Sequence, residues 1–476
     1  MRFFTILLVL TSLSIQTRSA SNELPTLGDA TSGLISLQQE YRLGRAWLQN
    51  LRQQAAVISD PVLTEYTENL IYRLASNSEV KDLRLEIILL DNPQLNAFAV
   101  PGGIIGINAG LFLYAQNESQ FAAVMAHELA HLSQRHFARQ VEESRKQAPI
   151  AMATLLGSIM LLATNNTEAG FAGLMTSQAA ATQWALSYSR DWEREADRLG
   201  MHTLVNSGFD PEGMPSMFEQ MYNAHKYSER PPEFLLTHPV TESRIADAAA
   251  RVDNLDKVKE TSDLDYQLVR TALLRQYKSA SHNLNYFQQA VTKAKNKDDK
   301  LIALYGLAQT HLDREEFQEA LAATQQLIKE DKSRISFITL HAQALYLSGN
   351  TTAALSLLEQ NLNLTPDNHP LTMSYADLLI KEQRFQKARN QLQRHVLLRS
   401  TDPAIWQKLG EAEGKLGNEV GQHRARAEFF FLTGYKQKAL KQLEIALEQS
   451  EENYLIAARI QQRAREISAS DKNLDF

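Results

Sequence analysis

Apolar positions in the first part of the chain change their spacing several times, and each change predicts a new element. From Leu34 to Val57 they recur at helical spacing, and a second helix is expected from Asp60 to Leu74. Residues 83–90 alternate and then become continuously apolar, as in a strand. Residues 96–107 predict two short strands joined at Pro101-Gly102-Gly103. The pattern therefore predicts a mainly helical domain with a small sheet, whose edge could accept an extended peptide or serve only as scaffold.

A further helical segment, beginning at Gln120, carries two histidines in the pattern His-Glu-x-x-His. His127 and His131 are four residues apart and share a helix face, so both imidazoles can bind one metal ion. Glu128 can reach a water molecule on that ion. Residues 135–146 are expected to continue this helix as a charged, solvated extension.

His136 lies near this motif but five residues beyond His131, a spacing that turns it away from the predicted metal-binding face. We therefore expect a surface histidine or one that supports a ligand from behind.

A second candidate part of the site is the segment 189–197, Ser-Arg-Asp-Trp-Glu-Arg-Glu-Ala-Asp. Glu193 and Asp197 are four residues apart and share a helix face. One of them can bind a metal ion while the other forms a hydrogen bond with a ligating histidine. Glu195 faces another direction and is expected to be a solvated charge. Spacing alone does not decide between Glu193 and Glu195 as the ligand.

Two apolar stretches, 148–163 and 171–181, lie between these motifs. Both are shorter than a membrane-spanning helix requires. We expect the region 148–181 to form a buried helical hairpin or a lid over the active site. Contact with a membrane surface or with a partner protein is the alternative.

The C-terminal half repeats small residues with a period of thirty-four. A second series follows twelve residues after the first three positions of the first. This resembles the tetratricopeptide pattern, in which paired helices cross at small residues, and it predicts an all-α solenoid with a concave, protein-binding face. The fourth unit departs from this pattern because Gln422 stands where alanine is expected. Ala427 and Ala439 recover the twelve-residue spacing, but half a period out of step with the earlier units. The two series are Ala308, Ala342, Ala376 and Gly410, and Ala320, Ala354 and Ala388.

The composition narrows the chemistry. The 476 residues are 44% hydrophobic and 22% charged with a net charge of −6, which fits globular domains and gives no support for nucleic-acid binding. The chain contains no cysteine, so disulfides, thiol catalysis and cysteine-bound metal are excluded. Any metal ligands must be histidine, aspartate or glutamate.

The first twenty residues predict export. A positive start at Arg2 is followed by an apolar run and by small residues before Ala20, although Arg18 is unusual so near a cleavage site. We expect a signal peptide at 1–20, a metallopeptidase domain at 21–260 and a repeat domain at 261–476. An exported chain without cysteine suits a bacterial periplasm, and no transmembrane segment is expected after signal removal.

The two motifs together carry a family resemblance. His-Glu-x-x-His followed by Ser-Arg-x-x-Glu-x-x-Ala-Asp resembles the paired signature of the HtpX-like metallopeptidases, a gluzincin group numbered family forty-eight. Residues 96–103, 237–239 and 242–244 are also similar to that family, and the match covers roughly residues 35–255.

The resemblance implies an α+β zincin fold of the gluzincin type with one zinc ion. It implies that His127, His131 and Glu193 bind the zinc, that Glu128 is the general base, and that Asp197 supports a ligand from behind. The choice of Glu193 over its neighbour rests on this resemblance.

His238, in the expected loop 234–239, also belongs to the resembling segments. It is expected either to stabilise the tetrahedral intermediate or to occupy the fourth zinc position and keep the enzyme latent. Arg244 is expected to pair with charge in the cleft or to form an ordinary surface salt bridge.

The combination of export signal, HtpX-like domain and repeats resembles periplasmic members of this family. It implies a zinc endopeptidase for quality control and assembly of outer-membrane β-barrel proteins, with a chaperone-like role. The implied partners are misfolded or unassembled outer-membrane proteins and the barrel assembly machinery, bound through the repeats. The alternative is a chaperone or binding module whose metal site is latent or idle.

Overall fold

The computed structural model describes residues 35–143, 156–157, 159–161, 163–164, 189–226, 232–255, 263–450 and 453–470. The expected signal peptide and most of the region 148–181 lie outside these residues. The described part of that region places Leu156 and Ile159 in the core, and the Trp47 indole donates a hydrogen bond to the Leu156 carbonyl over 3.0 Å. None of the described helices combines the length and the apolar composition needed to cross a bilayer.

A three-stranded sheet lies at the centre of the N-terminal part. Strands β1 (Glu86–Leu90), β2 (Ala97–Val100) and β3 (Ile104–Asn108) are ordered β1-β3-β2. β3 pairs in parallel with β1 and antiparallel with β2. Gly102 and Gly103 have φ angles of 83° and 77°, so the turn between β2 and β3 uses a conformation that glycine adopts without strain. The predicted strands and their joining turn are confirmed.

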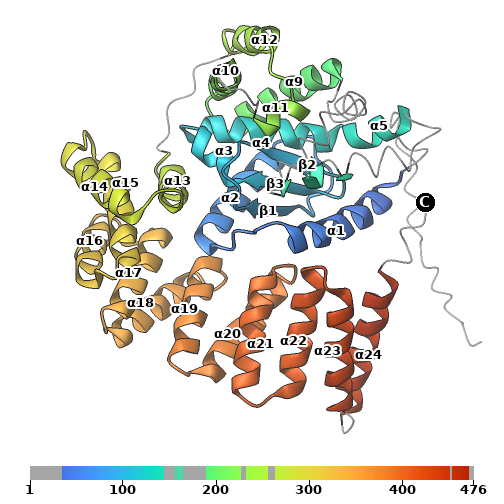
Figure 1. Cartoon of the computed structure of the whole chain (residues 1–476), viewed down its shortest axis with the longest axis vertical. Helices are drawn as coiled ribbons and strands as arrows, with labels where there is room; N and C mark the ends of the chain where they lie inside the picture. Colours follow the sequence, from blue (N-terminus) through green and yellow to red (C-terminus); the bar gives the residue numbers. More distant parts are fainter. Residues whose placement is uncertain are drawn as a thin grey trace, which may run out of the picture.

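Side chains of the sheet alternate between two apolar layers. Leu89 of β1 and Ile105 of β3 pack in the layer that contains helices α2 and α4, whereas Ile88 and Ile104 pack in the layer that contains α1. Figure 1 shows the sheet between these helices, which are α1 (Leu37–Gln54), α2 (Pro61–Ala75) and α4 (Glu118–Ser133).

The helix that carries His-Glu-x-x-His ends earlier than the sequence suggests. α4 stops at Ser133, Arg135 adopts a left-handed conformation with φ of 52°, and α5 (His136–Glu143) begins at the next residue. The expectation of one helix continuing through residues 135–146 is therefore wrong. The break follows from the conformation of Arg135, a non-glycine residue that gives no helix-stop signal in the sequence.

Five further helices with defined bounds belong to the described N-terminal part, beside the helical residues 156–157, 159–161 and 163. The segment expected as a loop at 234–239 is largely the short helix α11, and His238 is its C-cap. The five are α3 (Ala109–Tyr114), α9 (Arg190–Asn206), α10 (Gly213–Lys226), α11 (Glu233–Thr237) and α12 (Glu242–Val252).

The C-terminal half is an all-helical array, as the repeat predicts. Both alanine series are buried, and Gln422, where alanine was expected, lies over Gly414, whose missing side chain leaves room for the amide. The helices are α13 (Leu264–Gln276), α14 (Ala280–Lys293), α15 (Lys297–Asp313), α16 (Phe317–Glu330), α17 (Ile335–Leu347), α18 (Thr351–Leu364), α19 (His369–Lys381), α20 (Phe385–Leu398), α21 (Pro403–Lys415), α22 (Glu419–Leu432), α23 (Lys436–Glu448) and α24 (Tyr454–Ala469).

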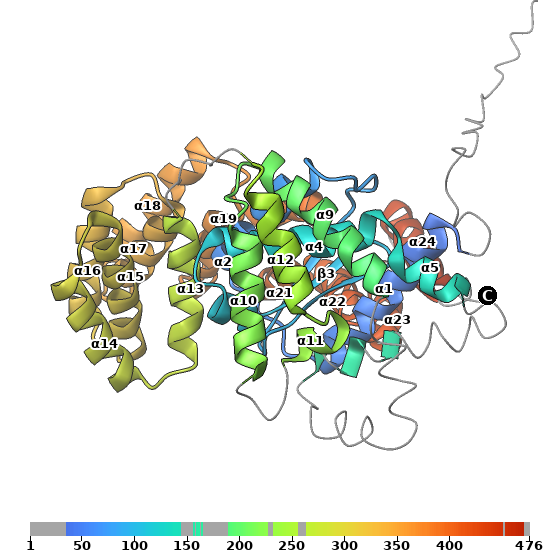
Figure 2. The same cartoon turned by 90° about the horizontal axis from the view of Figure 1, so that it is seen from above.

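The array curves around the N-terminal part and contacts it at several helices (Figures 1 and 2). α13 packs on α2 and α3, and α19 packs on α2. At the far end, Arg52 of α1 donates a hydrogen bond to the carbonyl of Leu432. The repeats are therefore docked along one side of the N-terminal part.

Candidate metal centre

Two helices with a close backbone approach build the centre. α9 passes α4 at Gly200, where an added Cβ would lie only 3.1 Å from the backbone nitrogen of His127. Ser189 caps the start of α9 by accepting a hydrogen bond from the Trp192 N–H. The absence of a side chain at Gly200 thus lets α9 bring Glu193 to the histidines of α4.

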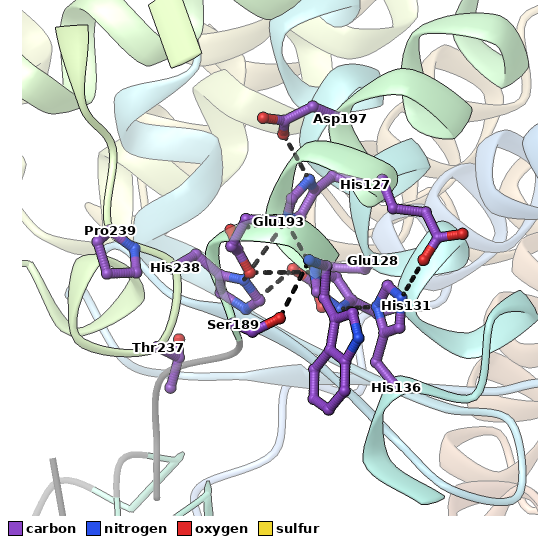
Figure 3. A network of polar contacts seen from close by, with 12 residues as sticks. His127, Glu128, His131, His136, Ser189, Glu193, Asp197, Thr237, His238 and Pro239 are labelled. Atoms are coloured by element: carbon purple, nitrogen blue, oxygen red, sulfur yellow. Dashed lines mark hydrogen bonds and ion pairs between the residues drawn. The ribbon is translucent and has the colours of Figure 1, made fainter. Parts of the chain in front are cut away.

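Four buried side chains converge on one point (Figure 3). His127, His131, Glu193 and His238 each offer one ligand atom, and these atoms all lie within 4.8 Å of one another. The Nε2 atoms of His127 and His131 are 3.0 Å apart, and Glu193 Oε1 is 3.4 Å from His131 Nε2. Two ligands of one tetrahedral zinc ion are expected to be about 3.3 Å apart. The spacing and the donor types therefore fit a zinc ion held by two imidazoles and a carboxylate.

Asp197 and Arg244 support this cluster from behind. Asp197 Oδ1 is 3.0 Å from His127 Nδ1, the nitrogen that points away from the cluster. Arg244 contacts both oxygens of Asp197 and also Glu193 Oε2, each at 2.7 Å. The Arg244 side chain is 5% exposed, so of the two expectations for this residue the pairing within the cleft holds.

The charges of the centre are set by burial and by these pairs. Burial opposes ionisation of Glu193, but His238 and Arg244 outweigh it and hold its pKa well below the ordinary value. Burial raises the pKa of Glu128 and lowers that of His131 well below its usual range. The arrangement therefore favours an ionised Glu193, a neutral His131 and, in Glu128, a carboxylate poised to take up a proton.

His238 lies inside the cluster. Its Nδ1 is 2.9 Å from Glu193 Oε1 and 3.4 Å from His127 Nε2, and its Nε2 is 3.6 Å from Glu128 Oε1. The short helix α11 before it and a hydrogen bond from Arg244 to the Pro239 carbonyl after it fix this position. The segment that carries His238 thus brings a third imidazole to the two on α4.

Of the two expectations for His136, support of a ligand from behind holds, whereas Glu195 differs from its expected position. His136 is fully buried because the helix break at Arg135 turns its ring back, and its Nδ1 lies 2.8 Å from His131 Nδ1. Glu195 is only partly solvated, with its side chain 30% exposed, and it pairs with His136 at 3.1 Å and with Arg139 at 3.2 Å. The sequence offered no local signal for either contact, since both depend on the left-handed residue between two helices.

A helix with His-Glu-x-x-His beside a small sheet, together with a carboxylate from a second helix, is the arrangement of a metallopeptidase. The family model described as "Peptidase family M48" matches residues 61–252, and the "Tetratricopeptide repeat" model matches residues 345–411. A protein of Escherichia coli K12 named "Beta-barrel assembly-enhancing protease" is 33% identical over 444 residues, which cover 93% of this chain and 91% of the relative.

Two further relatives have names that also describe proteases. In Vibrio cholerae, a protein whose name also contains "beta-barrel assembly-enhancing protease" is 35% identical over 88% of this chain and 87% of its own length. The "Mitochondrial metalloendopeptidase OMA1" of Schizosaccharomyces pombe is 28% identical over 42% of this chain and 56% of its own length. The chain belongs to peptidase family M48, in the group of the beta-barrel assembly-enhancing proteases. It is a metalloendopeptidase followed by tetratricopeptide repeats.

Proposed function

We propose that the protein is an exported zinc endopeptidase whose ion is held by His127, His131 and Glu193. The observation that carries this proposal is the buried convergence of these ligand atoms within 4.8 Å. Zinc would lower the pKa of its bound water and polarise the scissile carbonyl. Asp197 holds the His127 ring in place through its Nδ1.

Glu128 is the proposed general base. It follows the first histidine on α4, so its carboxylate projects beside the cluster, and it is only 1% exposed. Burial raises its pKa, which makes the carboxylate a better proton acceptor than a solvated one. Glu128 would take a proton from the attacking water and deliver it to the departing amine.

The outer edge of β2 is the proposed substrate-binding strand. Among the described residues no strand pairs with that edge, and α4 packs beside β2. Burial raises the pKa of Glu128, and the backbone N–H of Ala99 in β2 acts in the opposite direction by favouring the ionised carboxylate. An extended peptide added to β2 would therefore lie next to the general base. This arrangement favours unfolded segments as substrates, because a folded chain does not present a free strand.

His238 is proposed to act as a latency gate. Its contacts with Glu193, His127 and Glu128 place it where a fourth ligand would bind. Stabilisation of the tetrahedral intermediate remains the second role for this residue, and it requires His238 to stay near the carbonyl oxygen during the reaction.

The cell compartment and the clients are proposed from the relatives and the signal-like first twenty residues. We assign a signal peptide to 1–20, the peptidase domain to 21–260 and the repeats to 261–476. The names of the relatives support a role in β-barrel assembly. We propose that this role is periplasmic action on outer-membrane β-barrel proteins, in agreement with the signal-like first twenty residues. Misfolded or stalled barrels would be degraded, and the repeats would bind either these clients or the barrel assembly machinery.

A chaperone whose metal site is latent is the second candidate function, and the position of His238 within the cluster favours it. Replacing Glu128 with glutamine tests both functions. Glu128→Gln should retain zinc but lose cleavage of an unfolded protein by roughly 10²–10⁴-fold, the usual contribution of a general base.

Zinc content and cleavage rate are measured on the same preparations. Cleavage at the parent rate by Glu128→Gln would contradict the proposed mechanism. If neither protein cleaves but both capture envelope proteins, the chaperone function is correct.

A further inference from the structure

His136 is held in an unusual place by a residue with strained backbone. Arg135 is left-handed although it has a side chain. Its guanidinium donates to the Ile35 carbonyl over 2.6 Å and pairs with Glu40 at 3.1 Å, so contacts from outside α4 and α5 stabilise the break. The break returns the chain toward α4 and places the His136 ring behind His131.

The His136 ring is fixed on three sides. Its Nδ1 lies 2.8 Å from His131 Nδ1, and its Nε2 lies 3.1 Å from Glu195 Oε2. The flat face of the ring stacks on Trp192, with centroids 5.5 Å apart and an angle of 10° between the planes. Arg139 pairs with Glu195 and so holds the carboxylate in place.

These contacts determine where the protons lie. A carboxylate paired with arginine only accepts hydrogen bonds, so His136 Nε2 must donate to Glu195. The Nδ1 of neutral His136 then carries a lone pair, and it accepts the proton of His131 Nδ1. His131 is left with its lone pair on Nε2, the nitrogen that faces His127 and Glu193.

Helix α9 thus orients the two histidines of α4 in different ways. Asp197 Oδ1 lies 3.0 Å from His127 Nδ1 and contacts this ring directly, whereas Glu195 reaches His131 only through His136. Three carboxylates of α9 therefore have different roles. Glu193 is the proposed metal ligand, Asp197 contacts His127, and Glu195 acts on His131 through His136.

We propose that His136 and Glu195 are positioning residues that orient His131 and fix its proton for metal binding. This inference rests on the proposed zinc site. Neither residue touches the reacting atoms, so the effect should appear in metal affinity even when no substrate is present.

The test is the affinity of the full-length, metal-free protein for zinc, measured by competition with a chelator. His136→Phe keeps an aromatic ring on Trp192 but removes both nitrogens, and it should weaken zinc binding roughly 10–100-fold. Glu195→Ala should weaken it in the same direction. His136→Asn, whose amide oxygen can accept from His131, should recover part of the loss. His202→Phe, at an exposed histidine on α9, the helix that carries Glu195, is the matched control and should bind zinc like the parent.

Parent-like zinc affinity of His136→Phe would overturn the proposal, whether or not the metal-free variant melts at a lower temperature. If His136→Phe does not fold, Glu195→Ala and His136→Asn decide by the same measurement. His131→Ala is measured in parallel. If its zinc affinity equals that of the parent, the proposed metal site itself is wrong. If only His131→Ala loses zinc, the site stands and the positioning role fails.

Discussion

His238 contacts both functional carboxylates of the centre at once. Its Nδ1 bonds Glu193 and its Nε2 faces Glu128, so the imidazole occupies the space between a ligand and the proposed base. The pKa of His238 is raised because these two carboxylates outweigh its burial. In the proposed mechanism, a substrate carbonyl would need the same space to meet the attacking water. His238 therefore has to move before cleavage in the latent arrangement.

Removal of this imidazole should increase peptidase activity. His238→Ala is expected to cleave an unfolded protein several-fold faster than the parent, since the ligand atoms then face substrate without a competing group. Initial rates at equal zinc loading measure this. The double variant His238→Ala, Glu128→Gln should be inactive, which excludes a contaminating protease. A slower His238→Ala would instead assign His238 to stabilisation of the tetrahedral intermediate.

For single residues, the sequence predicts which two side chains lie together when both belong to the same helix. The pairing of His127 with His131, and of Glu193 with Asp197, follows from helical spacing. For His136 the sequence left two positions open, on the surface or behind a ligand, because helical spacing says nothing past Ser133, where the helix has already ended. Contacts that depend on a single backbone reversal leave no periodic trace in a sequence.

Helices α19 and α20 are joined by a buried histidine pair. His369 Nδ1 lies 2.9 Å from His395 Nε2, and the rings stack with an angle of 12°. Burial lowers the pKa of His369 to about 2 and that of His395 to about 4. Both are therefore neutral in the folded protein over a range in which the unfolded chain binds protons.

Stability should consequently decrease as the pH falls from about 6.5 toward about 4. In this window the unfolded histidines gain protons that the folded ones do not, at a cost of up to about 1.4 kcal/mol per pH unit for each fully buried histidine. Urea midpoints at pH 7.5 and 5 measure the loss. The double variant His369→Gln, His395→Gln should show a smaller loss. Glu65 and Asp402, whose raised pKa values act in the opposite direction, are present in both proteins. An unchanged pH slope would contradict the prediction.

Helices and strands with a strong local signal were predicted from the sequence, but the pairing of β1 with β3 was not. The Pro-Gly-Gly turn at 101–103 fixes two adjacent strands, and buried alanines at intervals of thirty-four fix the repeats. The parallel pairing of β1 with β3 joins strands that are not consecutive, so no turn residue announces it.

Helix α2 carries several of the contacts between the N-terminal part and the repeats. Glu68 of this helix forms a two-point ion pair with Arg399 at 2.6 and 2.7 Å, and Glu65 accepts hydrogen bonds from the side chain of Asn368 and the backbone of His369. α2 also packs against α4. The helix that receives the repeats is therefore a neighbour of the helix that carries the metal motif.

Reversing one charge of the ion pair should loosen this docking. Glu68→Arg places two cations together and is expected to increase the radius of gyration measured by small-angle X-ray scattering. The exchange Glu68→Arg, Arg399→Glu restores opposite charges and should return the parent value. Glu444→Arg, which breaks an exposed pair with Lys441 within α23, is the control and should leave the radius unchanged. A radius of Glu68→Arg equal to that of the parent would show that apolar contacts suffice.

The docking could not be predicted from the sequence. Glu65 and Asn368 are 303 residues apart, and each is an ordinary polar residue in its own helix. Only the folded arrangement of the array brings them together, so composition and period carry no information about the contact.

The left-handed residue Arg135 also limits how the chain length can vary. Surface connections usually tolerate insertions and deletions, but an added residue between His131 and His136 would move the His136 ring away from its position behind His131. A deleted residue would remove the reversal itself. The four-residue interval between these histidines should therefore be as invariant in length as the interval inside His-Glu-x-x-His, even though it crosses the junction between two helices.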